Sequence, residues 1–417
     1  MAEAAKPDGT RLEGITTKSP KKGLLASVPR RVMLQILVMA VNNFAISYLT
    51  IVIVAYLPQI GVSTATVGLV VGLEGLSMAI LAIPLGFLSD RRGRKRILIL
   101  GSLGIVPMFF VVAMTTETVP LVLAGMLGGV AEGSYLATVN ALIADQTAPE
   151  DRDSAFTLSF ILAGTGGSLG TALPFFVPAL SLLFGLSSHS VHDGLLMFFG
   201  IVSAMLPVGL YFILRGYRET LRPGMGLLRG KSTRNLLKFS GINSLIGLGA
   251  GFIIPLIPAW LFLKFAVPDT YSGPILALAG ATIGLAALYS PRLSRRLGPV
   301  KAITLTEGLS LVFMVSLAFM GNVTEAVLFY IIRAMLMNMS SPLSDSFLMG
   351  IVVPEERGLA SSINSVIWRI PNSVTTIVGG AILASGNYVL PFLLAGAFYA
   401  VAISLFYPTF RNVKPVS

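Results

Sequence analysis

The chain is a succession of apolar segments, each about 20 residues long, the length that a helix needs to cross a hydrocarbon core of about 30 Å. Charged residues, prolines or glycines separate the segments. They lack the period-2 alternation of a lipid-facing barrel, so helices are predicted throughout. The predicted spans are residues 32–57, 66–88, 97–115, 119–145, 154–182, 194–214, 240–263, 273–292, 300–320, 325–350, 359–384 and 388–408.

Composition agrees with a membrane setting. Hydrophobic residues make up 54% of the chain and charged residues only 12%, whereas about a quarter of the residues of a soluble protein are charged. The predicted class is therefore an all-α integral membrane protein with 12 transmembrane helices. The chain has no cysteine, which excludes disulfides and thiolate metal sites. We expect neither a cofactor nor a metal.

The positive charges predict the orientation. The net charge is +11, and with the N-terminus inside, all Lys and Arg except Lys264, Arg333 and Arg369 fall in cytoplasmic segments. This is the positive-inside pattern, which places both termini in the cytoplasm and argues against a nucleic-acid partner. Residues 1–31 are polar, so a cytoplasmic tail is predicted rather than a cleavable signal peptide. The expected location is the plasma (cytoplasmic) membrane.

A weak internal repeat indicates a duplicated chain. Residues 88–93 (LSDRRG) align with residues 293–298 (LSRRLG), and the same offset aligns 149–152 (PEDR) with 354–357 (PEER). A basic stretch at 215–238 lies between the two sets of helices and reads as a linker. The predicted organisation is a tail at 1–31, a six-helix bundle at 32–214, a linker at 215–238, a second six-helix bundle at 239–408 and a tail at 409–417.

The cationic turn at 86–96 (GFLSDRRGRKR) sits directly between two apolar segments. It resembles the hallmark loop of the major facilitator superfamily of secondary transporters, in which G, L, D, R, G and a basic run recur at this spacing. The Pro-Glu-x-Arg turns strengthen the resemblance. It implies two pseudo-symmetric six-helix bundles with a substrate site at their interface. The first and fourth helices of each half would line the cavity, the second and fifth would flank it, and the third and sixth would face lipid.

The resemblance also implies a gate at this turn. The aspartate at position 90 would meet the N-terminus of the eleventh helix, where helix dipoles favour an anion, and Arg94 would pair with Asp145. The second-half copy has Arg295 and Pro299 in the matching places, so the gate is expected on one side only. The candidate gating residues are Gly86, Asp90, Arg91, Gly93, Arg94 and Asp145.

Ionisable residues inside apolar segments are costly and are therefore functional candidates. A carboxyl group in an apolar cavity can exchange a proton near neutral pH, whereas a guanidinium stays charged. Glu132 and Glu74 are the predicted proton carriers, and Arg333 and Arg369 are predicted counter-ions or ligands for an anionic substrate group. Permanent structural ion pairs between such groups are the alternative.

For two further acids other roles are predicted: a structural pair for Glu307, on a peripheral helix, and a gate pair for Asp345, near the cytoplasmic end of its helix. His189 and His192, beside Asp193, form an H-x-x-H pattern for which a solvated external loop is favoured over a metal site. Polar groups that could complete a binding pocket, or bond helices together, are Asn42, Asn43, Tyr48, Asn140, Asn243, Asn338 and Trp368.

The leading hypothesis is a secondary active transporter of a small organic solute. The expected partners are protons and the lipid bilayer, and the protein is expected to work as a monomer. Proton-coupled efflux of a drug-like compound is favoured, with proton-coupled uptake of an organic anion as the alternative. Gly125 stands where many proton-coupled members carry an arginine, so antiport rests on analogy. A receptor or scaffold is the candidate from another class. An enzyme is not expected, because phosphate-loop and zinc-helix motifs are missing.

Overall fold

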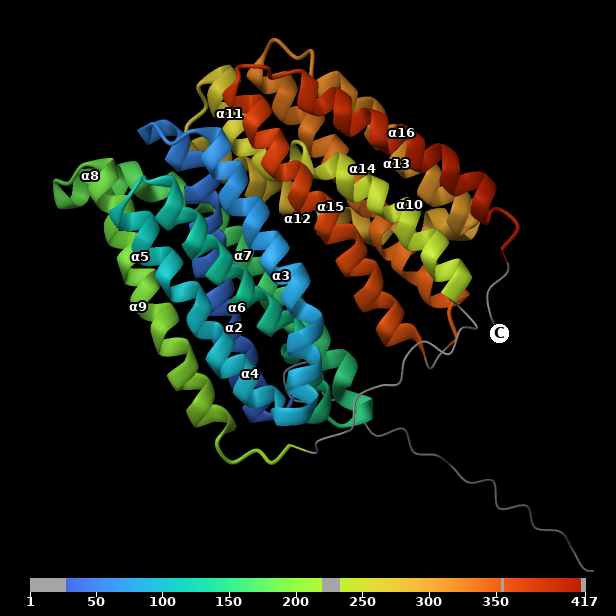
Figure 1. The fold of residues 1–417 in the computed structure, drawn as a ribbon, viewed down its shortest axis with the longest axis horizontal. Helices are drawn as coiled ribbons and strands as arrows, with labels where there is room; N and C mark the ends of the chain where they lie inside the picture. Colours follow the sequence, from blue (N-terminus) through green and yellow to red (C-terminus); the bar gives the residue numbers. More distant parts are fainter. Residues whose placement is uncertain (1–27, 220–232, 354–355, 414–417) are drawn as a thin grey trace, which may run out of the picture.

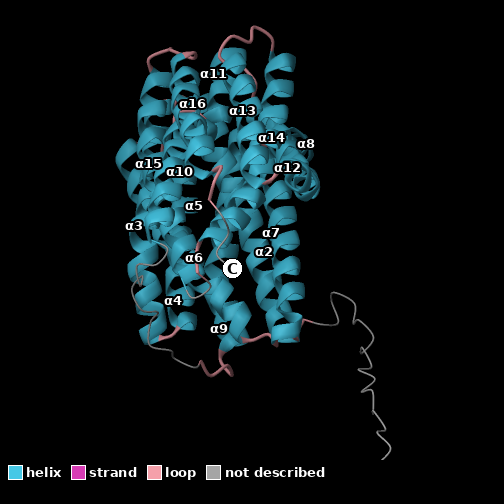
Figure 2. Cartoon of the chain, turned by 90° about the vertical axis from the view of Figure 1, so that its right-hand side faces the viewer, coloured by secondary structure: helices cyan, strands magenta, loops and turns pink. Residues whose placement is uncertain are grey.

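The structure is a computed structural model that describes residues 28–219, 233–353 and 356–413. The described residues are almost entirely helical and contain no strand (Figure 2). Eleven helical segments among them are long and apolar enough to cross a membrane. The remaining predicted span, 273–292, lies within the 29-residue helix α12.

The first set of helices comprises α2 (Arg30–Ile51), α3 (Thr64–Arg92), α4 (Arg94–Gly101), α5 (Val106–Met114), α6 (Thr118–Asp145), α7 (Arg152–Ala172), α8 (Val177–Phe184) and α9 (Ser188–Leu214). The second comprises α10 (Thr233–Gly251), α11 (Ile257–Phe265), α12 (Asp269–Leu297), α13 (Pro299–Leu317), α14 (Val323–Ile351), α15 (Arg357–Ala384) and α16 (Leu390–Phe410). Short 3-10 or π-helical segments join some of them: η1 (Val52–Tyr56), η2 (Leu57–Ile60), η3 (Ser102–Ile105), η4 (Pro149–Asp151), η5 (Leu173–Phe176) and η6 (Ile254–Leu256).

Several predicted spans are thus two helices in line. Pro174 in η5 and Pro255 in η6 are the second residues of 3-10 turns, since proline cannot donate the backbone hydrogen bond that a continuous α-helix requires. The helix α10 is already formed at Thr233, so the end of the predicted linker belongs to it.

The internal repeat appears in the backbone of two turns. Gly93 ends α3 with φ of 100°, and its counterpart Gly298 ends α12 with φ of 80°. Gly93 N donates to Ser89 O at 2.9 Å, and Gly298 N donates to Ser294 O at 2.8 Å. Both glycines hold a conformation that L side chains rarely adopt. The same residue type therefore ends the second long helix of each set in the same way.

Each set packs mainly on itself. In the first, α3 lies against α6, α2 against α7, and α5 against α9; in the second, α10 lies against α15 and α16, and α14 against α12 and α13. The two sets form the two groups seen in Figure 1, and they meet through α3 with α15 and α7 with α12.

The apolar core explains why the groups meet at one end only. One large cluster of buried residues draws on both groups, from Tyr48 and Leu57 to Trp260 and Phe392. Toward the end where the chain leaves α9 and enters α10, the core divides into two separate clusters, one around Leu98 and one in the other group. The groups consequently diverge toward that end (Figure 1).

Candidate functional site

Two cavities lie between and within the groups. The larger, about 620 Å³, is lined mainly by α10, α13, α14 and α15. The smaller, about 310 Å³, is lined mainly by α2, α3 and α6. Arg369 lines both, so they adjoin at its side chain. Predicted site residues in the larger cavity are Asn243, Arg333, Asn338, Trp368 and Arg369. Those in the smaller are Asn42, Asn43, Glu74, Glu132 and Arg369.

An ion pair crosses between the groups at this junction. Arg369 Nη2 of α15 lies 3.3 Å from Glu132 Oε1 of α6 and 3.4 Å from the sulfur of Met78 on α3. The side chains of Arg369 and Glu132 are 36% and 48% exposed. Both remain open to water and to a solute in the cavity, so the pair can be broken without uncovering buried charge.

The amides of the smaller cavity are bonded to neighbouring helices. Asn43 Nδ2 donates to Ala163 O on α7 at 2.7 Å, and Asn42 Oδ1 accepts from Ser203 Oγ on α9 at 3.2 Å. Glu74 also lines this cavity and forms no ion pair within the described residues. The amides therefore hold helices together while keeping an edge on the cavity.

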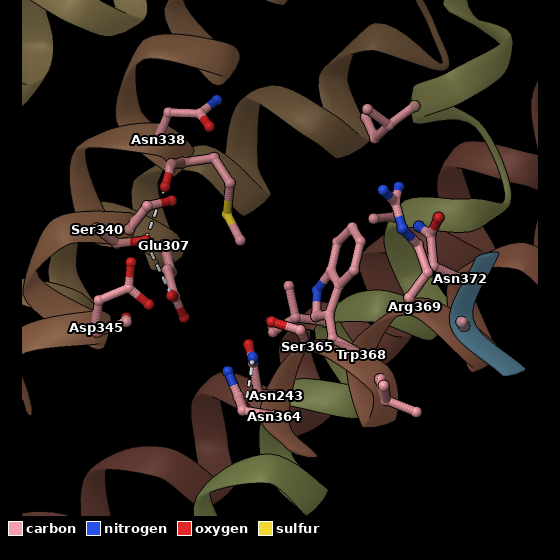
Figure 3. A pocket seen from close by; sticks show the side chains of 18 of the residues that line it. Asn243, Glu307, Asn338, Ser340, Asp345, Asn364, Ser365, Trp368, Arg369 and Asn372 are labelled. Atoms are coloured by element: carbon pink, nitrogen blue, oxygen red, sulfur yellow. Dashed lines mark hydrogen bonds between the residues drawn. The ribbon is translucent and has the colours of Figure 1, made fainter. Parts of the chain in front are cut away.

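In the larger cavity, Arg333 is 4% exposed and donates from Nη2 to the hydroxyl of Tyr399 at 2.7 Å. It has no carboxylate within ion-pair distance among the described residues, and its Nε has no hydrogen-bond partner there. Asn243 Nδ2 donates to Asn364 Oδ1 at 3.2 Å, as drawn in Figure 3. Asn338 bonds back to its own helix at Ala334 O.

Glu307 lies on α13, whose outer face exposes Leu305, Leu309 and Val312, but its own side chain points to the cavity. It is buried, lines the larger cavity and accepts a hydrogen bond from Ser340 Oγ at 3.1 Å (Figure 3). Asp345 lines the same cavity and forms no ion pair within the described residues, so the expected gate pair is not seen there. A carboxylate inside an apolar segment was the signal for Glu307, but the sequence alone did not show that this residue lies on the cavity-facing side of α13.

Tyr48 does not line either cavity. It is fully buried, and its hydroxyl lies 2.8 Å from His192 Nδ1. The placement of His189 and His192 in a solvated loop is also wrong, because both belong to α9 and His192 is 1% exposed. The helix begins earlier than hydropathy indicated, since Ser187 caps it by accepting from Ser190 N. Asn140 is exposed and is not part of either cavity wall.

At the cationic turn, the contact expected between Arg94 and Asp145 is present, and Arg94 Nη2 also lies 3.0 Å from Asp90 Oδ1. The contact of Asp90 with the start of α15 is not seen among the described residues, where its bonded partner is Arg94. Arg91 is exposed, and Gly86 O accepts from Ser89 Oγ.

Sequence reasoning missed Glu219, just beyond α9. Its carboxylate accepts from the backbone amides of Arg94 at 2.6 Å and Lys95 at 2.7 Å. These amides begin α4 and have no partner within that helix. Glu219 therefore caps α4 and ties the cationic turn to the chain leaving α9.

The family model described as Major Facilitator Superfamily matches residues 36–337 and 239–417. The multidrug resistance protein MdtG of Proteus mirabilis (strain HI4320) is 22% identical over 335 residues, covering 79% of this chain and 82% of MdtG. The inner membrane transport protein YajR of Escherichia coli (strain K12) is 35% identical over 114 residues, 27% of this chain and 24% of YajR.

The fold is also that of a solved transporter. An auto-inhibited peptide transporter of the POT family superposes with a TM-score of 0.73 over 93% of this chain and 98% of its own, at 15% identity. The family model matches the chain from within α2 to its C-terminal residue. The chain is a transporter of the Major Facilitator Superfamily.

Proposed function

We propose that this transporter exports cationic or neutral lipophilic organic compounds in exchange for protons, by alternating access. The observation that carries this proposal is the ion pair between Glu132 and Arg369, which joins the two groups at the wall of both cavities. Similarity to the protein named multidrug resistance protein MdtG supports a compound of this kind.

The pair supports exchange because Glu132 has three possible partners. Its carboxylate can hold Arg369, a proton or the positive group of a solute. A proton that binds the carboxylate removes the charge and releases Arg369, whose guanidinium stays charged. A cationic solute competes with that same proton, so the two would occupy the site in turn. This mutual exclusion is what antiport requires.

The charges of the cavity walls favour a cation. Two arginines, Arg333 and Arg369, face four acids: Glu74, Glu132, Glu307 and Asp345. Both arginines already have partners, Tyr399 and Glu132. A site that selects anions would instead present more positive than negative side chains.

Uptake of an organic anion with protons is the second candidate. It is favoured by one observation, the Nε of Arg333, which has no hydrogen-bond partner within the described residues and belongs to a side chain on the cavity wall. An anionic group could accept from it.

The proposed orientation follows from the Lys and Arg residues, which gather at the end where the groups diverge. We assign that end, and both termini, to the cytoplasm. The protein would lie in the cytoplasmic membrane and work as a monomer. The structure would then be an inward-facing state, in which α3 with α15 and α7 with α12 close the opposite end.

The test uses purified protein in liposomes that contain a trapped pH dye, with lipophilic cations and organic anions added in separate runs. Proton movement opposite to a cation is expected. Glu132→Gln should abolish this proton movement and retain exchange of labelled for unlabelled solute. Glu325→Gln, at an exposed position at the start of α14, is the matched control and should retain both activities.

The other outcomes are distinct. Proton movement together with an anion would replace the proposal by the second candidate. Loss of both proton movement and exchange in a folded Glu132→Gln would contradict its role as proton carrier. No solute movement with any compound would overturn both candidates.

A further inference from the structure

A buried polar network joins the two groups away from the cavities. His192 of α9 is 1% exposed, and Asp269, the first residue of α12, is 3% exposed. Their side chains approach to 3.2 Å, from Nε2 to Oδ2. The histidine belongs to the first group and the aspartate to the second. None of the network lines either cavity.

Residues of the first group complete the network. Tyr48 places its hydroxyl 2.8 Å from His192 Nδ1, and the ring of Tyr56 stacks on that of His192 with centroids 4.0 Å apart. Gln59 Nε2 donates to Asp269 Oδ1 at 3.1 Å. The other carboxylate oxygen, Oδ2, accepts no hydrogen bond within the described residues. The balance of negative charge at this oxygen therefore depends on His192.

The charge on His192 decides how well that compensation works. A buried carboxylate is strongly destabilising unless a positive charge or enough donors face it. An imidazolium supplies the positive charge, whereas a neutral imidazole supplies at most one donor. Tyr48 tolerates both states, because its hydroxyl can accept from Nδ1–H of the imidazolium or donate to the bare Nδ1 of the neutral ring.

Other titratable groups lie close by on the first group. His189 Nδ1 lies 2.8 Å from the hydroxyl of Tyr56, and His189 Nε2 lies 3.5 Å from Oδ2 of Asp193, which is one turn further along α9. All three belong to the first group, so their contacts are kept whether the groups are together or apart. His189 is therefore a suitable control: it is also a histidine of α9, but its contacts do not join the two groups.

We propose that His192 and Asp269 form a proton-binding site that closes the end of the transporter opposite the divergent one. When His192 holds a proton, the pair attracts and the two groups stay together at this end. When the proton leaves, Asp269 is left undercompensated and separation, which returns it to water, is favoured. Closure is thus stronger when the histidine is protonated, at low pH, than when it is neutral, at high pH. This site is separate from Glu132 and stands whether or not Glu132 carries protons.

The chain has no cysteine, so single reporters can be introduced cleanly. Ser188→Cys and Gly321→Cys place spin labels at exposed positions near this end, one on each group. Distances between the labels are measured in nanodiscs, without added solute, from pH 5 to pH 8. We expect the short-distance population to grow as pH falls, with a change on the order of tenfold in the ratio of closed to open forms. A distribution that does not change with pH would overturn the proposal.

Variants in the same labelled background test the assignment. His192→Gln and Asp269→Asn should each remove the pH dependence. If His192→Gln folds poorly, Asp269→Asn still tests the proposal, because its amide oxygen can accept the hydrogen bond from Gln59. His189→Gln should keep it. The proposal is wrong if His189→Gln removes the pH dependence while Asp269→Asn retains it.

Discussion

Arg369 of α15 and Glu132 of α6 form an ion pair of 3.3 Å that joins the two groups of helices at the junction of two cavities. Both side chains are more than a third exposed. The pair therefore holds the groups by a contact that water, a proton or a solute can replace.

The exposure of this pair predicts a small effect on stability. Exposed ion pairs contribute about 0 to 1 kcal/mol, so Arg369→Gln should lower the free energy of unfolding by no more than about 1 kcal/mol. Thermal unfolding in detergent measures this, with Glu325→Gln as the control for loss of an exposed charge. A loss of several kcal/mol would instead identify Arg369 as a structural residue.

The close approach of α3 and α15 predicts a strict size limit at Gly68. A Cβ there would lie 2.8 Å from Thr376 O and 2.9 Å from Gly380 Cα. Gly68→Val should push the groups apart at this end, shift the population toward the other orientation and slow transport at least about tenfold, a shift of about 1.4 kcal/mol.

Solute uptake into liposomes, together with the Ser188 and Gly321 label distance, measures this effect. Gly209→Val is the matched control, since nothing lies within 4 Å of a Cβ at that glycine. Equal transport by both variants would mean that the contact of α3 with α15 does not limit the cycle.

The cap that Glu219 provides predicts local stabilisation of α4. Loss of a helix-capping acceptor costs about 0.5 to 2 kcal/mol, and a negative charge at a helix N-terminus adds to the effect. Glu219→Ala should therefore raise amide hydrogen exchange at residues 94–97, whereas Glu150→Ala, at an exposed position in η4, should leave it unchanged. Unaltered exchange in Glu219→Ala would show that the cap is dispensable.

The position of Glu307 on the cavity wall predicts a role in selecting cations. Glu307→Gln keeps an acceptor for Ser340 Oγ and removes the negative charge. Since a hydrogen bond to a charged group contributes about 1.5 to 3 kcal/mol, the KM for cationic solutes should rise about tenfold or more. The KM for neutral solutes and the melting temperature should change little. A similar rise for both kinds of solute would indicate a structural role.

The apolar spans and the turn at 86–96 predicted the fold well, because lipid imposes helical backbone bonding on every long apolar segment. The repeat was equally informative, and Gly93 and Gly298 show its physical basis in one shared backbone conformation. Helix ends were less predictable. The first turn of α9 is polar, so hydropathy assigned His192 to a loop although the helix buries it.

The candidate site was predicted in part. Intramembrane charge located Glu74, Glu132, Arg333 and Arg369 on cavity walls. The partners of these residues depend on how helices rotate about their own axes, which depends in turn on packing between segments far apart in the chain. That rotation brings Glu307 to the cavity and takes Tyr48 away from it.

The sequence by itself determined the class of protein and its succession of long apolar helices, because these follow from transfer of single residues between water and lipid. Only the tertiary structure decided which charges meet. Glu132 and Arg369 are separated by 237 residues, and His192 and Asp269 belong to different groups. Such contacts depend on distances of a few ångströms between helices, and only packing of the whole chain establishes those distances.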